Sequence, residues 1–439
     1  MARQRVVELT LLLLAAFITV ATVTISAVDE RVAWSWGVVP YLTGLMVLWA
    51  VTHLALRRWA SSSNGLLFPI TALLQGLGFA FIVRIDPELA NNHFAWSVAA
   101  TCGFLLVLKG LDDLSWLQKA RPYVGVLGAL LLLAPGIIAA GPGTRGSSST
   151  IDIGAVSIAP QQLGNLFLIT FFAAWLSRYR SRNTAEHLGQ VQPLDGDPSR
   201  FLPLVGGWLL ISILVIFHSD MSLGFTTFII FVSMWWIAAG RTRDLAVFLA
   251  AITGSLVVAA GSIAETKSIF AAWIDPWGNP ELGNASIQSS FALAGGGLTG
   301  TGPGGGSADL IPGATDLFAF VPLAEELGFI GGAAVLLSYL LLVGVGLRLA
   351  VAARTEFDTI LASGIAIFFG AQAWASIAAV VRFLPPTGLS LPFVALNGSL
   401  LVTCNIALAL LLKVSEAAPN VSARTQLLPQ ISVQIPGDQ

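Results

Sequence analysis

The side chains that could do chemistry gather in the long segment between Trp273 and Gly328. This segment carries a glycine-rich run and several carboxylates, although only 10% of the residues of the chain are charged. Loops of this length are usually functional or disordered. Asp316 is the first candidate. It directly precedes the apolar run 317–324 at a predicted membrane surface, where desolvation raises the pKa of a carboxylate toward the range of a general base. The alternative is that Thr315 and Asp316 cap a helix that begins in this run.

Two further carboxylates, Glu325 and Glu326, fall at or inside the start of a predicted membrane span. Acidic side chains within a membrane are costly and by default indicate function. The alternatives are that they reach back to the interface or pair with Arg382. Arg382 itself precedes a Leu-Pro-Pro-Thr-Gly turn, where its guanidinium could bind a lipid diphosphate or anchor the helix at the interface.

Asp275 and the glycine-rich run 295–306 have structural interpretations as well. Asp275 lies in Trp-Ile-Asp-Pro-Trp, and the Asp-Pro step favours a turn over a chemical role. The glycine run could bring backbone amides to phosphate oxygens. It lacks the Lys-Ser/Thr ending of a phosphate-binding P-loop, so we interpret it as a flexible outer loop.

The elements that must position these residues are membrane helices. The chain has 439 residues, 55% of them hydrophobic, and a mean hydropathy of +0.81. A soluble protein has about 25% charged residues, so a soluble fold is excluded. We predict an all-α, polytopic integral membrane protein with about 12 transmembrane helices, each about 20 residues long, and a large extracellular loop. The predicted spans are 9–28, 37–56, 66–83, 94–108, 123–140, 160–176, 203–218, 222–239, 245–263, 327–347, 359–380 and 391–412.

Loop charge predicts the orientation, because Lys and Arg collect in cytoplasmic loops. With the N-terminus inside, 17 of the 22 basic residues fall in inner loops and 5 in outer ones. We therefore expect both termini in the cytoplasm. Residues 1–413 would form one transmembrane domain with an extracellular loop at 264–326, and the proline-containing tail 414–439 would be disordered. The four His residues show no metal-ligand spacing, so we expect no metal site built by the protein alone.

Four sequence blocks, in this order, resemble the SEDS family of RodA, FtsW and SpoVE proteins. The resemblance covers about residues 145–412, and the overall layout looks most like RodA-type proteins of actinobacteria. The blocks are Ser157-Ile-Ala-Pro160, Ser219-Asp220 with Leu223-Gly224, the outer loop from Trp273-Ile-Asp-Pro276 through Thr315-Asp-Leu-Phe318 to Glu325-Glu-Leu-Gly328, and Arg382 to Phe393 followed by Asn397-Gly-Ser399.

The resemblance implies a function at the outer face of the bacterial cytoplasmic membrane. SEDS proteins polymerise lipid II into glycan strands there, with a class B penicillin-binding protein as partner. The family's essential outer-loop aspartate falls on Asp316, which would act as general base in an inverting transfer. The leaving undecaprenyl diphosphate needs a cation, supplied by basic side chains or by a divalent metal such as Mg or Mn. The candidate substrate-binding residues are Arg382, Glu325, Glu326, Asp275, Lys267 and Ser399.

Several charged positions of the family pattern are neutral in this chain. The Glu and Lys that follow Ser-x-Gln-Pro are Gln162 and Asn165, and an Arg before Trp-x-Asp-Pro is Ile269. Pro-Glu-x-His becomes Pro312-Gly-Ala, and Tyr-Gly-Gly-Ser-Ser becomes Leu396-Asn-Gly-Ser-Leu400.

These losses leave three hypotheses open. The first is a divergent glycosyltransferase, and the second is a degenerate SEDS protein that binds precursor or partner as a scaffold or regulator. The third is a transporter of lipid-linked precursor, which the nearly charge-free spans disfavour. The catalytic hypothesis expects Asp316 near Arg382, at the outer mouth of a groove that opens sideways to the bilayer.

Overall fold

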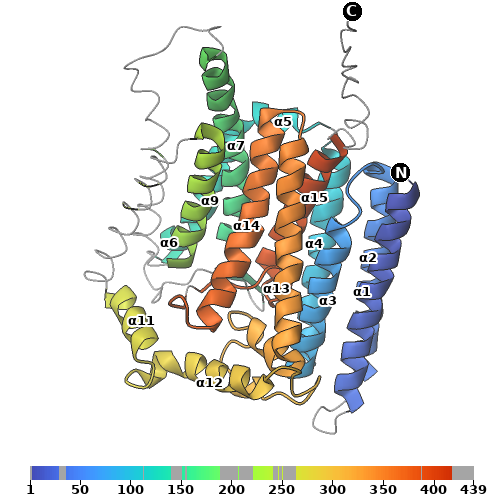
Figure 1. Cartoon of the computed structure of the whole chain (residues 1–439), viewed down its shortest axis with the longest axis vertical. Helices are drawn as coiled ribbons and strands as arrows, with labels where there is room; N and C mark the ends of the chain where they lie inside the picture. Colours follow the sequence, from blue (N-terminus) through green and yellow to red (C-terminus); the bar gives the residue numbers. More distant parts are fainter. Residues whose placement is uncertain are drawn as a thin grey trace, which may run out of the picture.

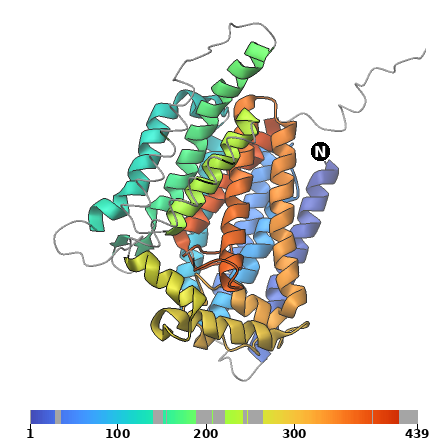
Figure 2. The ribbon, with the colours of Figure 1, turned by 60° about the vertical axis from the view of Figure 1, so that its left-hand side comes forward.

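The computed structural model is a bundle of long helices with a layer of shorter helices across one end (Figures 1 and 2). It describes residues 2–28, 36–111, 113–139, 151–153, 156–187, 221–240, 264–386 and 388–417, with the single positions 206, 246 and 250. The helices are α1 (Ala2–Val28), α2 (Val39–Trp59), α3 (Leu67–Ile85), α4 (Leu89–Gly110), α5 (Ser115–Lys119), α6 (Arg121–Ala139), α7 (Pro160–His187), α9 (Met221–Ala239), α11 (Ala264–Ile274), α12 (Pro280–Gly296), α13 (Phe320–Ala352), α14 (Glu356–Val380) and α15 (Gly398–Ala417). Two 3-10 turns, η1 (Trp36–Val38) and η3 (Ala308–Leu310), and an antiparallel pair of short strands, β1 (Ile151–Ile153) and β2 (Val156–Ile158), complete the described elements.

The prediction of a helical, polytopic membrane protein is confirmed. Within the described residues, seven helices are long and apolar enough to cross a membrane, namely α1, α2, α3, α4, α13, α14 and α15. Three further predicted spans coincide with α6, α7 and α9. The predicted spans 203–218 and 245–263, and the Ser219-Asp220 hairpin between spans, lie outside the described residues.

The last span was predicted to begin at residue 391, which is wrong. Residues 391–397 form a loop instead, with Phe393 at φ 66°. Pro392 removes a backbone N–H, and the Asn397 side chain accepts the Leu400 N–H at 3.1 Å, as a residue at a helix start does. The same helix continues through Ala417, so residues 414–417 of the predicted tail are helical, and 418–439 lie outside the described residues.

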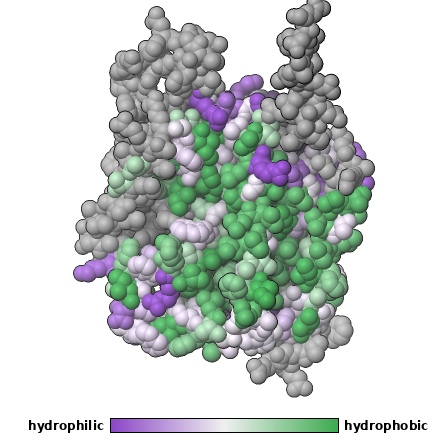
Figure 3. Space-filling view, in the orientation of Figure 1, coloured by the Kyte–Doolittle hydropathy of each residue, from purple (hydrophilic) through white to green (hydrophobic). Residues whose placement is uncertain are grey.

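Helices α3 and α14 form the centre of the bundle, since 78% of the apolar window of each is buried. The windows of α4 and α13 are only 28% buried. Figure 3 shows the consequence on one face of the molecule: apolar side chains dominate its middle, and hydrophilic ones lie mostly toward its two ends. This distribution is that of a bundle whose sides contact lipid.

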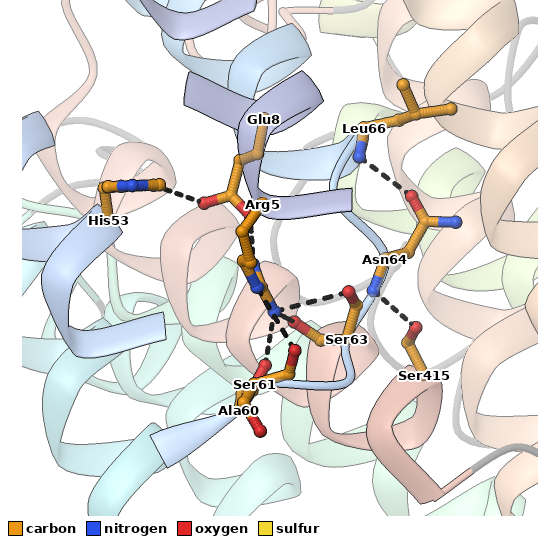
Figure 4. Close-up of polar contacts among 9 residues, drawn as sticks. All are labelled: Arg5, Glu8, His53, Ala60, Ser61, Ser63, Asn64, Leu66 and Ser415. Carbon is orange, nitrogen blue, oxygen red and sulfur yellow. Dashed lines mark hydrogen bonds and ion pairs between the residues drawn. The ribbon is translucent and has the colours of Figure 1, made fainter. Parts of the chain in front are cut away.

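One end of the bundle is fastened by a buried polar cluster, shown in Figure 4. Arg5 and Glu8 of α1 form an ion pair, and Glu8 also lies 2.8 Å from Nδ1 of His53 in α2. In the following loop, the Asn64 N–H donates to Ser415 Oγ near the end of α15 at 2.8 Å. The start of α1 and the end of α15 therefore lie at the same end of the molecule, as an even number of membrane crossings requires.

The opposite end is covered by α11 and α12, which lie across it at the bottom of Figures 1 and 2. The predicted outer loop 264–326 is thus largely structured, with α11, α12, η3 and the first part of α13. Helix α13 is interrupted at Gly328, whose φ of 67° and ψ of −171° are not helical. The segment before this break, Phe320 to Leu327, directly follows the turn that carries Asp316.

Candidate active site

Asp316 lies in a tight turn between η3 and α13. Its backbone N–H and that of Phe318 both donate to the Gly313 carbonyl, at 3.0 and 2.9 Å. Gly313 adopts φ 77°, a conformation that favours glycine. The prediction that Asp316 caps a helix is wrong, because α13 begins at Phe320 with Ala319 at its N-cap and has no side-chain cap.

The Asp316 carboxylate instead faces the loop between α14 and α15. The Ser390 hydroxyl donates to Asp316 Oδ1, and the Asn397 side-chain amide donates to Ser390 Oγ at 3.2 Å. The two backbones are joined as well, since the Leu396 N–H donates to the Thr315 carbonyl at 2.8 Å. Two segments that are distant in the sequence are thereby held together around one carboxylate.

Burial controls the electrostatics of this carboxylate. Asp316 is half-buried, and desolvation raises its pKa above the ordinary value. Hydrogen bonds from Ser390 and Asn397 act in the opposite direction and lower the pKa. The result is a carboxylate whose pKa lies above that of a solvated aspartate, which suits a general base.

Glu325 and Glu326 are buried against the glycine run. The Glu326 carboxylate pairs with Arg84 at the end of α3 and accepts the Gly304 N–H at 2.8 Å. Glu325 accepts the Ser307 N–H at 3.0 Å. The alternative in which these acids pair with Arg382 is therefore wrong, because Arg84 is the cation of Glu326. In this structure the hydrogen-bond and ion-pair partners of both carboxylates are groups of this chain.

The glycine run packs on α13, a role that neither interpretation of its sequence included. The N–H groups of Thr301 and Gly302 donate to the carbonyls of Glu325 and Glu326, both at 3.0 Å. Gly300 has φ 83°, and a Cβ there would lie 2.0 Å from the Glu326 carbonyl oxygen. Only glycine permits this close approach of backbone to backbone.

Arg382 belongs to a second contact, between α11 and the end of α14. Its Nη2 donates to the Trp273 carbonyl at 2.9 Å, and Trp273 Nε1 donates to the Arg382 carbonyl at 3.1 Å. The Arg382 Nε is buried and has no hydrogen-bond partner in the described part of the chain. The predicted proximity of Arg382 to Asp316, and the groove beside Asp316, stay predictions.

The remaining candidate residues are exposed or accept hydrogen bonds from backbone N–H groups. Asp275 is exposed and closes the turn between α11 and α12 by accepting the Gly278 N–H at 3.0 Å, which agrees with its interpretation as a turn residue. Lys267 is exposed on α11. Ser399 accepts the Ala159 N–H at 2.8 Å and so ties the start of α15 to the segment before α7.

A family profile described as Cell cycle protein, that of FtsW, RodA and SpoVE, matches residues 88–420, which is most of the chain. The chain belongs to the SEDS family.

Named SEDS relatives resemble the chain over most of its length. The peptidoglycan glycosyltransferase RodA of Mycobacterium leprae is 32% identical over 429 residues, which cover 94% of this chain and 91% of that protein. The RodA of Mycobacterium tuberculosis is 30% identical over 430 residues, with the same coverage. The stage V sporulation protein E of Bacillus subtilis is 30% identical over 374 residues, 81% of this chain and 97% of that protein.

Solved SEDS structures have the same fold. The crystal structure of the Thermus thermophilus rod shape determining protein RodA superimposes with a TM-score of 0.58 at 22% identity, over 83% of this chain and 99% of that chain. A chain of a peptidoglycan synthase complex that coordinates polymerization and crosslinking gives a TM-score of 0.64 at 22% identity, over 81% of this chain and 98% of that chain.

Two of the SEDS positions that are neutral in this chain, Gln162 and Asn165, lie in α7 of the membrane bundle. Asn165 of α7 accepts a hydrogen bond from Thr227 of α9 at 2.8 Å, and Gln162 accepts one from Gln372 of α14 at 3.5 Å. Asn165 and Gln372 are buried. The positions where the SEDS pattern has Glu and Lys thus hold neutral side chains that join α7 to its neighbours.

Two residues of this region were not identified from the sequence. Arg84 is a lone cation at the end of a span, and nothing local indicates its partner, which lies far along the chain. Ser390 is the one polar residue between Gly388 and Asn397, and an isolated polar residue in an apolar stretch of the SEDS signature is the signal that could have identified it.

Proposed function

We propose that this SEDS protein is a peptidoglycan glycosyltransferase that polymerises lipid II on the outer face of the cytoplasmic membrane. The observation that carries the proposal is the Asp316 carboxylate, half-buried between two loops of the SEDS signature and raised in pKa. The relatives named peptidoglycan glycosyltransferase support the reaction class. Both termini would be cytoplasmic, and the α11–α12 end of the bundle would face outward.

In this mechanism Asp316 accepts the proton of the acceptor sugar's 4-hydroxyl. The freed oxygen forms a bond to the anomeric carbon of the lipid-linked donor and inverts it. The bond from that carbon to the diphosphate oxygen breaks, and undecaprenyl diphosphate leaves with the electron pair. A base of raised pKa accepts this proton at lower cost than a solvated aspartate does.

The departing diphosphate needs positive charge near it. Arg382 offers a guanidinium whose buried Nε has no hydrogen-bond partner among the described residues, and Lys267 is the other outer-layer cation we propose. In the described part of the chain no three His, Cys, Asp or Glu side chains gather into a metal site. A divalent ion such as Mg²⁺ would fit only if the diphosphate itself supplied most of its ligands, because Mg²⁺ is commonly held by one or two carboxylates and substrate phosphates.

We further propose a class B penicillin-binding protein as partner. The supporting observation is the fold similarity to a chain of a solved peptidoglycan synthase complex. The alternative is a SEDS protein that binds precursor or partner without polymerising, and the neutral Gln162 and Asn165 favour it.

Glycan polymerisation from labelled lipid II tests the proposal. The purified protein is assayed with its class B partner and a divalent metal, beside Asp316→Ala and Asp309→Ala. Asp309 is an exposed acid of the same outer layer and serves as the matched control. The proposal expects product that is lost in Asp316→Ala and kept in Asp309→Ala. A folded complex that binds lipid II and forms no product would support the non-catalytic alternative.

A further inference from the structure

A chain of three hydrogen bonds runs from the start of α15 to Asp316. The Leu400 N–H donates to Asn397 Oδ1 at 3.1 Å, Asn397 Nδ2 donates to Ser390 Oγ at 3.2 Å, and Ser390 donates to Asp316 Oδ1. Ser390 is only 2% exposed, so water does not compete freely for its hydroxyl.

The direction of this chain is fixed by helix α15. The amide of Asn397 has one accepting and one donating end. Its oxygen is occupied by an N–H of the first turn of α15, so its NH₂ group must face Ser390. The Ser390 hydroxyl has one hydrogen, and its oxygen already accepts from Asn397. The hydrogen therefore goes to Asp316.

We propose that Asn397 and Ser390 are positioning residues that fix the Asp316 carboxylate and keep it in its proton-accepting form. This inference rests on the proposed function. It adds two residues to the site and gives each a defined role as a hydrogen-bond donor. The first turn of α15 is the end of the hydrogen-bond chain that fixes its direction.

The environment of Asp316 explains why it needs this chain of hydrogen bonds through Asn397 and Ser390, which we call the relay. Burial favours the protonated form, which cannot act as a base. No ion pair reaches Asp316 in the described residues, and no charged group contributes to its pKa shift. The two side chains that oppose burial are Ser390 and Asn397. Donated hydrogen bonds take the place of a cation.

The relay depends on a departure of this chain from the SEDS pattern. Asn397 stands where the Tyr-Gly-Gly-Ser-Ser pattern has its first glycine, which has no side chain to donate. In this chain the same residue both begins α15 and reaches Ser390, so one substitution supplies the cap and the donor.

Asn397→Asp is the sharpest test, because it separates the two functions of Asn397, which are to accept the Leu400 N–H at the start of α15 and to donate to Ser390. An aspartate oxygen still accepts the Leu400 N–H, so α15 keeps its start. A carboxylate cannot donate, so it takes the Ser390 hydrogen for itself and adds a negative charge near Asp316. Ser390→Ala removes the donor directly, whereas Ser390→Thr keeps a hydroxyl. Asn279→Asp, at the N-cap of α12, is the matched control for the same chemical change.

The first readout is the pH dependence of kcat/KM for polymerisation. Asn397→Asp and Ser390→Ala should move the acid limb to higher pH by about one unit, since one lost charge-assisted hydrogen bond has that magnitude. The rate at high pH should change much less. Ser390→Thr and Asn279→Asp should keep the wild-type profile.

The second readout needs no turnover. An infrared titration of the carboxyl band, taken as the difference between each protein and its Asp316→Asn counterpart, follows Asp316 alone. The same upward shift is expected in Asn397→Asp and Ser390→Ala. An unshifted titration overturns the relay, whatever the activity. Absence of polymerisation together with a shifted titration overturns the proposed function and leaves the relay standing.

Discussion

The ion pair between Arg84 and Glu326 should control whether the glycine run stays docked on α13. Both side chains are nearly inaccessible, 9% exposed for Arg84 and 0% for Glu326. Arg84 also donates to the carbonyls of Gly304, at 3.0 Å, and Gly306. Replacing Arg84 with Met removes the charge, keeps much of the volume and leaves the buried Glu326 carboxylate without its cation.

The cost follows from burial. Removing one partner of a buried ion pair destabilises the structure by about 3–5 kcal/mol. The other bonds between the run and this part of α13 are hydrogen bonds, most of them from backbone N–H groups such as those of Thr301, Gly302 and Ser307, so we expect the loss of the ion pair to appear as local opening. Since each 1.4 kcal/mol is a factor of ten, amide exchange in the run should become at least about 100-fold faster.

Hydrogen exchange read by mass spectrometry on a peptide covering residues 301–307 measures this opening directly. The Gly302 and Gly304 N–H groups in that peptide donate to Glu326, at 3.0 and 2.8 Å. Arg57→Met, an exposed arginine at the other end of the bundle, is the matched control and should leave the peptide unchanged.

A double variant separates the loss of the ion pair from the cost of leaving the Glu326 carboxylate unpaired. Arg84→Met with Glu326→Gln removes the unpaired charge and keeps an acceptor for the Gly304 N–H. Exchange should then be at least about tenfold slower than in Arg84→Met alone, because contacting residues couple by about 0.5–3 kcal/mol. The reasoning is refuted if Arg84→Met exchanges within about threefold of wild type, or if the effects of the two substitutions are additive.

Three further outcomes follow from the same structure. Gly300→Ala should speed exchange in the same peptide, because its Cβ would lie 2.0 Å from the Glu326 carbonyl, whereas Gly295→Ala meets nothing within 4 Å and should not. Glu8→Gln should lower the thermal unfolding midpoint, since Arg5 loses its buried partner at a cost of about 3 kcal/mol, and Thr10→Ala on the same helix is its control. In the wild-type protein, polymerisation should rise with pH through a pKa above that of a solvated aspartate, because burial raises the pKa of Asp316 and only its ionised form accepts a proton. An acid limb that lies at or below the ordinary pKa of an aspartate would contradict that assignment.

The helices were predictable because each apolar stretch has the length that a bilayer demands. Their ends were less so. The start of α15 depends on Asn397 accepting one N–H, and the break in α13 depends on Gly328 meeting the glycine run. Both are contacts between segments, and hydropathy contains no information about them.

The candidate site was likewise predictable only in part. Asp316 could be identified because the block Thr315-Asp-Leu-Phe318 matches the SEDS pattern at the position of the family's outer-loop aspartate. Its partners could not be identified, since Ser390 and Asn397 reach it only after α14 has returned the chain to the α11–α12 end of the bundle. The pairing of Glu326 with Arg84 could not be foreseen either. Arg84 and Arg382 are both basic residues of the predicted outer face, neither is close to Glu326 in the sequence, and only the packing of α3 beside α13 selects Arg84.

The lost charges and the retained aspartate have different physical consequences. Within the bundle, Asn165 stands where the SEDS pattern has a Lys and accepts a hydrogen bond from Thr227, and this neutral pair costs less to bury between helices than a charge does. At Asp316 the reverse holds, because desolvating a half-buried carboxylate is costly and two side chains stabilise its ionised form. A scaffold needs only the contact between these two loops, to which the backbone hydrogen bond from Leu396 to Thr315 already contributes without any charge. The donors that surround Asp316 therefore favour a protein in which this carboxylate still accepts a proton.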